Sequence, residues 1–308
     1  MHRFGYCCIN LTLGEGKGSD RITTNRSMVK KTFEEKGIPF ASEVALLNCL
    51  DLVKIIRWNN EAGIQMYRMS SDIFPWYSEY EFCDLPHFEE IKNVLAEAGS
   101  IAKSGDQRIT FHPSPYSVLA SQKKDVVDKA IKDLRQHAEI MDYMGLDQTH
   151  FYPINVHVYT SQPSKEEAAS RFCENFQKLP DPVKKRLVVE NDDKKSGFTP
   201  VELHELVFQK IGVPLTYDYL HHRCNPSDLN EEQALSLCLK TWPDKISPIV
   251  HYSDSKKQWE DSSTKELAHS DWIYEQVKNY GHEFSIEFEV KMKEKALLKY
   301  LDDFDVQK

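Results

Sequence analysis

The sequence has no apolar run that approaches the roughly 20 residues a transmembrane helix needs, so a membrane-spanning segment is excluded. It has only seven cysteines, with no CxxC pair, and Cys7 and Cys8 are adjacent. This usage argues against a disulfide scaffold or a cysteine zinc site. The opening stretch MHRFGYCCINLTLGEG is too weakly apolar and basic for a secretory signal. We therefore expect an intracellular protein with reduced thiols, in the cytoplasm or nucleoid, or in the nucleus of a eukaryote.

An excess of positive charge is also absent. The chain has 39 Lys and Arg against 48 Asp and Glu, a net charge of -9, which argues against a general polyanion binder. Short basic groups occur at residues 123–124, 184–186, 194–195 and 256–257. They are either a basic rim on one face or ordinary solvated charges. Divalent cations bound among the carboxylates would offset part of the negative charge.

No Gly/Ser linker or low-complexity tract divides the 308 residues, and 40% of them are hydrophobic. Eight strand-like segments fall at residues 3–10, 64–70, 108–112, 150–158, 186–192, 213–219, 247–252 and 283–290. Helical patterns follow Ser42, Pro86, Gln122 and Ser164. Another runs from Thr199 to Gly212, a further one opens at Asn230, and a last one runs through Leu297, Leu298 and Leu301. This alternation predicts an α/β fold: a (β/α)8 TIM barrel forming a single domain over residues 1–308.

Most of the apolar runs end in a residue that can bind a metal. RITFH, FYPINVH, RLVVE, PLTYD, SPIVH and FSIEFE end at His112, His157, Glu190, Asp218, His251 and Glu289. The carboxyl ends of barrel strands meet at one face, where such enzymes carry their chemistry. A single His or Glu at a strand end is more often a hydrogen-bonded rim residue or a salt-bridge partner. Six such residues at the ends of six apolar runs would need six separate structural explanations. We therefore expect them to form one cluster of metal ligands.

His221 and His269 extend this mixed nitrogen and oxygen set, which suits Mn, Zn or Fe rather than Ca. Glu190 and Asp218 lie on adjacent predicted strands, so either carboxylate could bridge two ions about 3.5 to 4 Å apart. Such a site would hydrolyse a phosphodiester. The loop at residues 253–263, rich in Lys, Asp and Ser, is the segment we expect to be mobile.

Seven segments, spread along essentially the whole chain, resemble those of the UV damage endonuclease family, which is itself similar to endonuclease IV. They are GYCCINLTLG, RMSSDIFPW, FHPSPY, RLVVENDD, YDYLHHRCNP, VHYSDS and EFEVKMKEK. The resemblance implies a TIM barrel with two or three Mn-type ions. It also implies a single nick in damaged double-stranded DNA, directly 5′ of a UV photoproduct such as a cyclobutane pyrimidine dimer or a 6-4 photoproduct. No obligate protein partner follows from it.

The resemblance also assigns roles to the candidate ligands. His112, His157 and Glu190 look like the ligands of one ion. His221 and His269 look like ligands of a third ion. The second ion's ligands look like Glu190, Asp218, His251 and Glu289. Glu190, Asp218 and His251 are accordingly the expected catalytic residues.

Four further residues are expected at the DNA. Tyr6 and Asn10 match a pair that the family places on the lesion side, and Tyr116 matches an aromatic that enters the duplex beside flipped-out nucleotides. Without the motif, each of the two tyrosines would be interpreted as an aromatic side chain that packs in the core. Lys291 is a candidate phosphate contact or an ordinary exposed lysine.

The chain departs from the family pattern at two positions. Pro115 stands where the family has a probing glutamine, and Ile249 where some members have a modified metal-contacting lysine, so no such lysine is assigned. The FPWY run at residues 74–77 is either a wedge against bases or a Pro-aromatic loop cap.

Three alternatives stay open at this stage. Sugar isomerases with related barrels also gather His, Glu and Asp around divalent metals. A lesion-binding protein without turnover is favoured by Pro115, and an abasic-site endonuclease is a third reading. The complete ligand set and the Tyr6, Asn10 and Tyr116 matches favour hydrolysis at photoproducts by in-line attack of an activated water, which would leave a 3′ hydroxyl and a 5′ phosphate.

Overall fold

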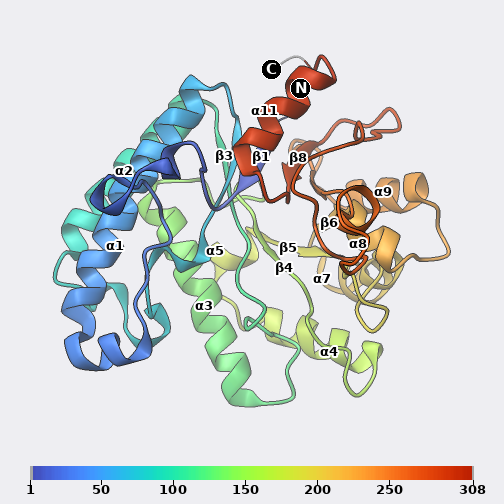
Figure 1. Cartoon of the computed structure of the whole chain (residues 1–308). Helices are drawn as coiled ribbons and strands as arrows, with labels where there is room; N and C mark the ends of the chain where they lie inside the picture. Colours follow the sequence, from blue (N-terminus) through green and yellow to red (C-terminus); the bar gives the residue numbers. More distant parts are fainter. Residues whose placement is uncertain (1–2, 307–308) are drawn as a thin grey trace.

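A closed barrel of eight parallel strands, paired in sequence order from β1 to β8 and back to β1, forms the centre of the computed structural model, which describes residues 3–306 (Figure 1). This confirms the predicted TIM barrel. The strands are β1 (Phe4–Cys7), β2 (Met66–Met69), β3 (Arg108–Phe111), β4 (Ile154–Val156), β5 (Leu187–Glu190), β6 (Leu215–Asp218), β7 (Ile249–Tyr252) and β8 (Ser285–Phe288).

Helices surround these strands in Figure 1, with α1, α2 and α3 along one side and α11 beside β1. They are α1 (Lys30–Glu61), α2 (Phe88–Ser104), α3 (Lys124–Tyr143), α4 (Lys165–Phe176), α5 (Asp181–Lys184), α6 (Pro200–Leu203), α7 (Gln209–Ile211), α8 (Tyr219–Cys224), α9 (Glu231–Leu239), α10 (Lys256–Trp259) and α11 (Lys293–Asp303). A π-helical turn, His204–Phe208, joins α6 to α7. No helix in the described part of the chain has the length and apolar character needed to cross a membrane.

The predicted helices are present, with one start misplaced. α1 begins at Lys30, well before the position after Ser42. Gly37 has φ 64° and Pro39 follows it, so the helix contains a kink there, and the periodic pattern is regular only beyond the kink. The α6–α7 segment follows its sequence signals closely: Thr199 caps it with a capping box, and Gly212 ends it at φ 67°.

Side chains alternate between the barrel interior and the helical shell along each strand. Met66, Val188 and Ile249 pack together with Trp242 in a small apolar cluster separate from the main core. Their sequence neighbours Tyr67, Val189 and Val250 belong to the main core. Residues two positions further along the same strands therefore point into the barrel above the apolar cluster. Those residues are Arg68, Glu190 and His251.

The end of β1 and the loop after β7 differ from expectation. β1 ends at Cys7 rather than at residue 10, because Cys8 adopts a left-handed conformation with φ 67°. The loop expected to be mobile begins with three buried residues, Ser253, Asp254 and Ser255, and continues into α10. They are packed because Ser253 Oγ bonds His269 Nδ1 at 2.8 Å and Asp254 accepts from Tyr274 N at 2.8 Å.

Candidate metal centre

One group of potential metal ligands joins the ends of three consecutive strands. His112 and His157 directly follow β3 and β4, and Glu190 is the last residue of β5. Glu190 Oε2 lies 3.3 Å from His112 Nε2 and 3.7 Å from His157 Nε2. The three ligand atoms lie within 4.8 Å of one another, close enough to share one ion. Parallel pairing of β3, β4 and β5 brings the residues together although 78 positions along the chain separate the first from the last (190 − 112).

A second group continues around the barrel. It consists of Glu190, Asp218, His251 and Glu289, again with ligand atoms within 4.8 Å of one another. His251 Nδ1 lies 2.9 Å from Glu190 Oε2 and 3.1 Å from Glu289 Oε1. The two groups share Glu190, which therefore joins them into one cluster. The structure thus brings together all six residues expected at the strand ends.

The remaining two histidines lie beside the second group. His221 Nδ1 is 3.0 Å from Glu190 Oε1, and His269 Nε2 is 4.0 Å from Glu289 Oε2. Their ring centroids are 6.3 Å apart. An antiparallel bridge between Ser255 and His269 places the latter, which comes from no strand end. These two rings are a pair next to the two larger groups rather than a third group of three ligands.

The donor set fits divalent metal ions. Asp218 Oδ2 is buried and has no hydrogen-bond partner among residues 3–306. An orphaned buried carboxylate oxygen is costly unless a cation or a donor satisfies it. Side-chain exposure increases outward, from 0% at Glu190 and Asp218 to 12% at His221 and 24% at His269. The cluster is thus fully buried at one end and partly exposed at the other.

Side chains outside the ligand set hold these groups in place. Asp218 Oδ1 accepts from His221 N at 2.7 Å, which caps α8, and Asn191 Oδ1 accepts from Asp218 N at 2.8 Å. The Asn155 amide donates to Glu190 Oε2. Sequence reasoning missed Asn155 and Asn191. Asn155 lies two residues before His157, and so on the same face of its strand, which was the available signal.

Arg68 is the largest unpredicted component of the site. It lies on β2, is buried, and points across the barrel to β8, where its Nε donates to Glu287 Oε2 at 2.8 Å and its Nη2 to Glu289 Oε1 at 2.5 Å. Arg68 Nη2 also lies 3.0 Å from His251 Nε2. Thr110 Oγ1 donates to Glu287 Oε1 at 2.6 Å. A buried guanidinium thereby neutralises carboxylates that would otherwise repel one another.

The electrostatics follow from this crowding of charge. Burial alone would raise the pKa of Glu190, but His251 and His157 outweigh it and hold that pKa well below its usual range. Burial alone would lower the pKa of His251 and His221, yet the neighbouring carboxylates raise both well above the usual value. For Glu287, Arg68 and His251 overcome burial and lower the pKa to about 2. Burial and adjacent carboxylates raise the pKa of Asp218.

The residues expected at the DNA divide into exposed and buried ones. Tyr116 is 84% exposed, and Lys291 is exposed. Tyr6 and Asn10, expected on the lesion side, are 0% and 1% exposed and so lie in the protein interior. Tyr6 Oη donates to Asn59 Oδ1 at 2.8 Å and accepts from Asn10 Nδ2 at 2.9 Å. Because β1 packs against α1, Tyr6 and Asn10 point into the protein. There they support the loop after β1.

The FPWY run is a loop cap. Phe74 is 1% exposed, and Trp76 donates from Nε1 to Met28 O at 2.9 Å while stacking on Phe33. The Tyr77 hydroxyl donates to Asp133 on α3. Each aromatic ring therefore contacts another ring of the protein, which favours a loop cap over a wedge against bases.

A hollow of about 270 Å³ borders the metal-ligand groups. Pro115, His157, Asp192, Lys194 and His221 are among its lining residues. Lys194 brings one of the predicted basic groups to this rim, whereas Arg186, from another group, is fully buried and pairs with Asp142 at 2.7 Å. The basic groups therefore do not form one continuous rim.

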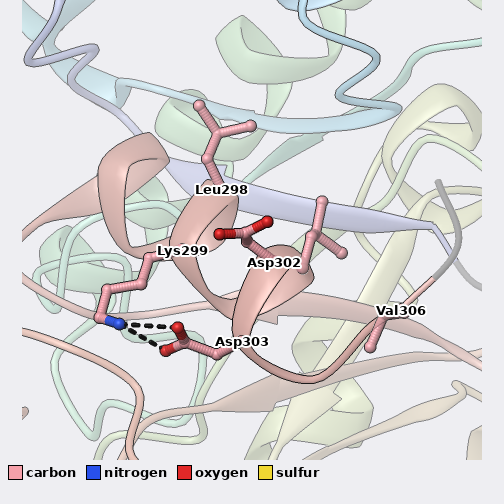
Figure 2. A pocket seen from close by; sticks show the side chains of 6 residues that line it. Leu298, Lys299, Asp302, Asp303 and Val306 are labelled. Atoms are coloured by element: carbon pink, nitrogen blue, oxygen red, sulfur yellow. Dashed lines mark hydrogen bonds and ion pairs between the residues drawn. The ribbon is translucent and has the colours of Figure 1, made fainter.

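A larger hollow, of about 480 Å³, lies along α11. Figure 2 shows Lys299 and Asp303 paired on that helix, with Nζ 2.6 Å from Oδ2. None of the residues lining it belongs to either ligand group. This hollow is therefore separate from the ligand groups at the strand ends.

Fold and site together define a (β/α)8-barrel protein whose strand ends carry a buried cluster able to hold metal ions. The family model described as UV-endonuclease UvdE matches residues 2–308. The chain therefore belongs to the UV-endonuclease UvdE family, and it is an endonuclease by that membership.

Individual relatives agree with this assignment. A UV DNA damage endonuclease of Bacillus cereus is 30% identical over 98% of this chain and 94% of its own length. A UV-damage endonuclease of Schizosaccharomyces pombe is 32% identical over 99% of this chain, but the match spans about half (51%) of that relative. The crystal structure of SacUVDE superposes with a TM-score of 0.83 at 30% identity, covering 100% of both chains.

More distant structures share the fold alone. Endonuclease IV from Thermus thermophilus has a TM-score of 0.55 at 12% identity, covering 83% of this chain and 95% of that one. A 3-keto-D-glucoside 4-epimerase from E. coli also has a TM-score of 0.55, at 11% identity over 82% of this chain and 92% of that one. Architecture by itself therefore does not separate a nuclease from a sugar epimerase.

Proposed function

We propose that this protein nicks the DNA backbone directly 5′ of UV photoproducts, cyclobutane pyrimidine dimers and 6-4 photoproducts, by metal-dependent phosphodiester hydrolysis, and so initiates excision repair. The observation that carries the proposal is the pair of ligand groups joined by Glu190 at the strand ends of a barrel whose relatives are named UV-damage endonucleases. Two ions sharing one carboxylate suit an in-line phosphoryl displacement.

His112, His157 and Glu190 would hold one ion, and Glu190, Asp218, His251 and Glu289 a second. His221 and His269 would contribute to a third at the exposed end. The mixed imidazole and carboxylate donors favour Mn among the common divalent ions. Bound there, the ions would polarise the phosphate, generate a hydroxide nucleophile near neutral pH and neutralise the leaving oxygen.

The protein's own residues position and screen that chemistry. Arg68 holds Glu289 and His251 in one arrangement, and Asn155 and Asn191 orient Glu190 and Asp218. Fixed donors of this kind reduce the rearrangement needed as charge moves in the transition state. Hydrolysis with cleavage at the 3′ oxygen leaves a 3′ hydroxyl and a 5′ phosphate.

Recognition of damage is assigned to the exposed rim. Tyr116 stands out from the loop after β3 and would enter the base stack where damaged nucleotides leave it. Lys291 is exposed, with no ion-pair partner among the described residues, and would contact a phosphate. Tyr6 and Asn10 would act indirectly, because they support the loop after β1 from the protein interior.

The test is nicking of a labelled duplex that carries one defined photoproduct, with Mn and with EDTA, by the wild type and by Glu190→Gln. Glu89→Gln is the control, since Glu89 is exposed on α2. We expect a Mn-dependent nick directly 5′ of the lesion, lost only in Glu190→Gln.

Three results would overturn the proposal. Stronger nicking of a matched abasic duplex would indicate an abasic-site endonuclease. Tight binding to damaged duplex with no nick under any divalent ion would indicate a lesion-binding protein. Formation of ketose from aldose by the purified protein would indicate the sugar isomerase, a reading that now has only the fold likeness to epimerases in its support.

A further inference from the structure

The loop after β3, residues 113–121, is anchored along its whole length. Tyr159 Oη donates to Pro113 O at 3.3 Å, and Ser117 N donates to Ser114 O at 3.1 Å. At its far end the loop accepts from α4, where Asn175 Nδ2 donates to Leu119 O at 2.8 Å and Arg171 Nε to Ala120 O at 2.8 Å. The backbone of this loop is thus fixed by several neighbouring elements.

Tyr116, in the middle of the anchored loop, is the most exposed large hydrophobic side chain in the described part of the protein, at 84%. No hydrogen bond or ring contact of its side chain occurs there, although Tyr116 N donates to Ser114 Oγ at 3.4 Å. Its neighbour Pro115 lines the hollow next to His157 and His221. A free aromatic ring therefore stands at the edge of the metal-ligand groups on a held backbone.

A single half-buried carboxylate, Asp133, is bonded to Ser117, the residue after Tyr116. Asp133 on α3 accepts from the Ser117 hydroxyl through Oδ2 and from the Tyr77 hydroxyl through Oδ1. Ser117 is 3% exposed, and the Asp133 side chain is 14% exposed. Asp133 thereby joins the loop that carries Tyr116 to the packed FPWY cap and to a long helix.

We propose that Asp133 is a positioning residue for damage recognition: it holds the 113–121 loop rigid so that Tyr116 enters the DNA base stack as a preformed wedge. This inference rests on the proposed function and names how the same site handles its substrate. Opening a stacked step is unfavourable by itself, and a mobile loop would add the entropy lost on ordering its backbone.

The same reasoning gives Pro115 a role. Proline fixes its own φ and restricts the residue before it, so it stiffens the backbone directly beside Tyr116. A glutamine at this position would offer hydrogen bonds to a base, whereas proline offers none but reduces the flexibility of the loop. In this chain, damage probing therefore depends on one stiffly held aromatic ring.

The experiment uses Asp133→Ala, Ser117→Ala, Tyr116→Ala and the double variant Asp133→Ala/Tyr116→Ala. Asp128→Asn is the matched control, because Asp128 is on the same helix but is exposed and pairs with the exposed Lys124. Two signals are measured: fluorescence of 2-aminopurine placed beside a photoproduct, which reports unstacking, and kcat/KM for nicking. Hydrolysis of bis(p-nitrophenyl) phosphate with Mn reports the metal centre without DNA.

We expect Asp133→Ala to lower the unstacking signal and to reduce kcat/KM on the photoproduct duplex about tenfold, which corresponds to about 1.4 kcal/mol. Ser117→Ala should show a smaller loss of the same kind, and Asp128→Asn none. Hydrolysis of the small phosphodiester should stay unchanged. The double variant should be no worse than Tyr116→Ala, because the two residues act through one wedge.

Additive losses in the double variant, or equal loss of small-diester hydrolysis, would show a merely structural role and overturn the inference. If Asp133→Ala fails to fold, Ser117→Ala carries the test, since it removes one hydroxyl only. Failure of the proposed function is distinguishable: the wild type would then leave the photoproduct duplex uncut while still hydrolysing the small diester. If the wild type does not unstack the duplex at all, Tyr116 does not act as a wedge and the inference is wrong.

Discussion

Arg68 Nη2 lies 2.5 Å from Glu289 Oε1, joining the second strand of the barrel to the end of the last one inside the barrel. β1 separates these two strands in the sheet, so the contact crosses the interior rather than following a ladder. The guanidinium carries positive charge into a centre that holds Glu190, Asp218, Glu287 and Glu289. It therefore stabilises the metal-free site.

Replacement of Arg68 should expose that role. We expect Arg68→Gln to lower the free energy of unfolding of the metal-free protein by about 3–5 kcal/mol, because it leaves buried carboxylates without their cation. Added Mn should recover part of this loss by supplying positive charge. Thermal unfolding with EDTA and with Mn measures both effects.

The control for Arg68 is Arg57→Gln. Arg57 pairs with Glu97 at 3.2 Å, but both side chains are more than half exposed, so the change should cost about 0–1 kcal/mol. An Arg68→Gln protein with wild-type stability in EDTA would contradict the proposed neutralisation.

Loss of Glu190 should remove more metal than loss of any other ligand, because both groups include it. We expect Glu190→Gln to retain at least one Mn fewer per chain than the wild type after dialysis. His269→Gln should affect only the exposed end. Elemental analysis gives the stoichiometry.

Thermal unfolding gives an independent readout of the same prediction. A ligand at about 100 times its Kd adds about 2.7 kcal/mol of stability, and this increment should be lost with Glu190. Equal metal content in the wild type and in Glu190→Gln would refute the shared-ligand arrangement.

Metal binding should release protons. The pKa values of His221 and His251 are raised in the metal-free fold, so these groups stabilise it below their unfolded pKa of about 6.5, and this contribution is lost as the pH rises through the folded pKa values. Imidazole must be neutral to bind a metal. We therefore expect Mn affinity to rise with pH while metal-free stability falls.

Calorimetry in buffers of different ionisation enthalpy measures the protons released, and urea unfolding in EDTA measures stability. A Mn affinity that is independent of pH between about 6 and 9 would contradict the charged histidines. The Glu190→Gln variant should release fewer protons, because one of the carboxylates that raise the pKa of His221 and His251 is gone.

Burial of Tyr6 predicts a structural phenotype. Tyr6→Phe leaves Asn10 Nδ2 and Asn59 Oδ1 without a partner, and we expect it to lower the free energy of unfolding by about 1–3 kcal/mol. Photoproduct nicking should fall less than in Tyr116→Ala. Urea unfolding and nicking assays at saturating Mn separate the two effects.

Tyr280→Phe is the matched control for this hydroxyl. Tyr280 is only half-buried where its Oη bonds Glu231 at 3.0 Å, so water can replace the lost contact. A Tyr6→Phe protein with native stability and no nicking would show that the Tyr6 hydroxyl reaches the substrate after all.

Much of the scaffold was predictable because its signals are local. Each strand is a short apolar run, and capping residues or glycines mark several helix ends, as Thr199 and Gly212 do. The kink in α1 was not predictable in the same way, since the pattern before Gly37 lacks a regular apolar face. The short helices α5, α8 and α10 were missed because four to six residues are too few to show a helical period.

The sequence by itself determined the ligand types and their places at strand ends, and closure of a parallel barrel was enough to predict that they meet. Only the tertiary structure decided that Arg68 and Glu287 occupy the space beneath them, that Tyr6 and Asn10 turn inward, and that Tyr116 stays free. The physical reason is the distance along the chain over which each property is decided. Alternation along a strand follows from local geometry, whereas burial and pairing depend on which distant side chains reach the same point.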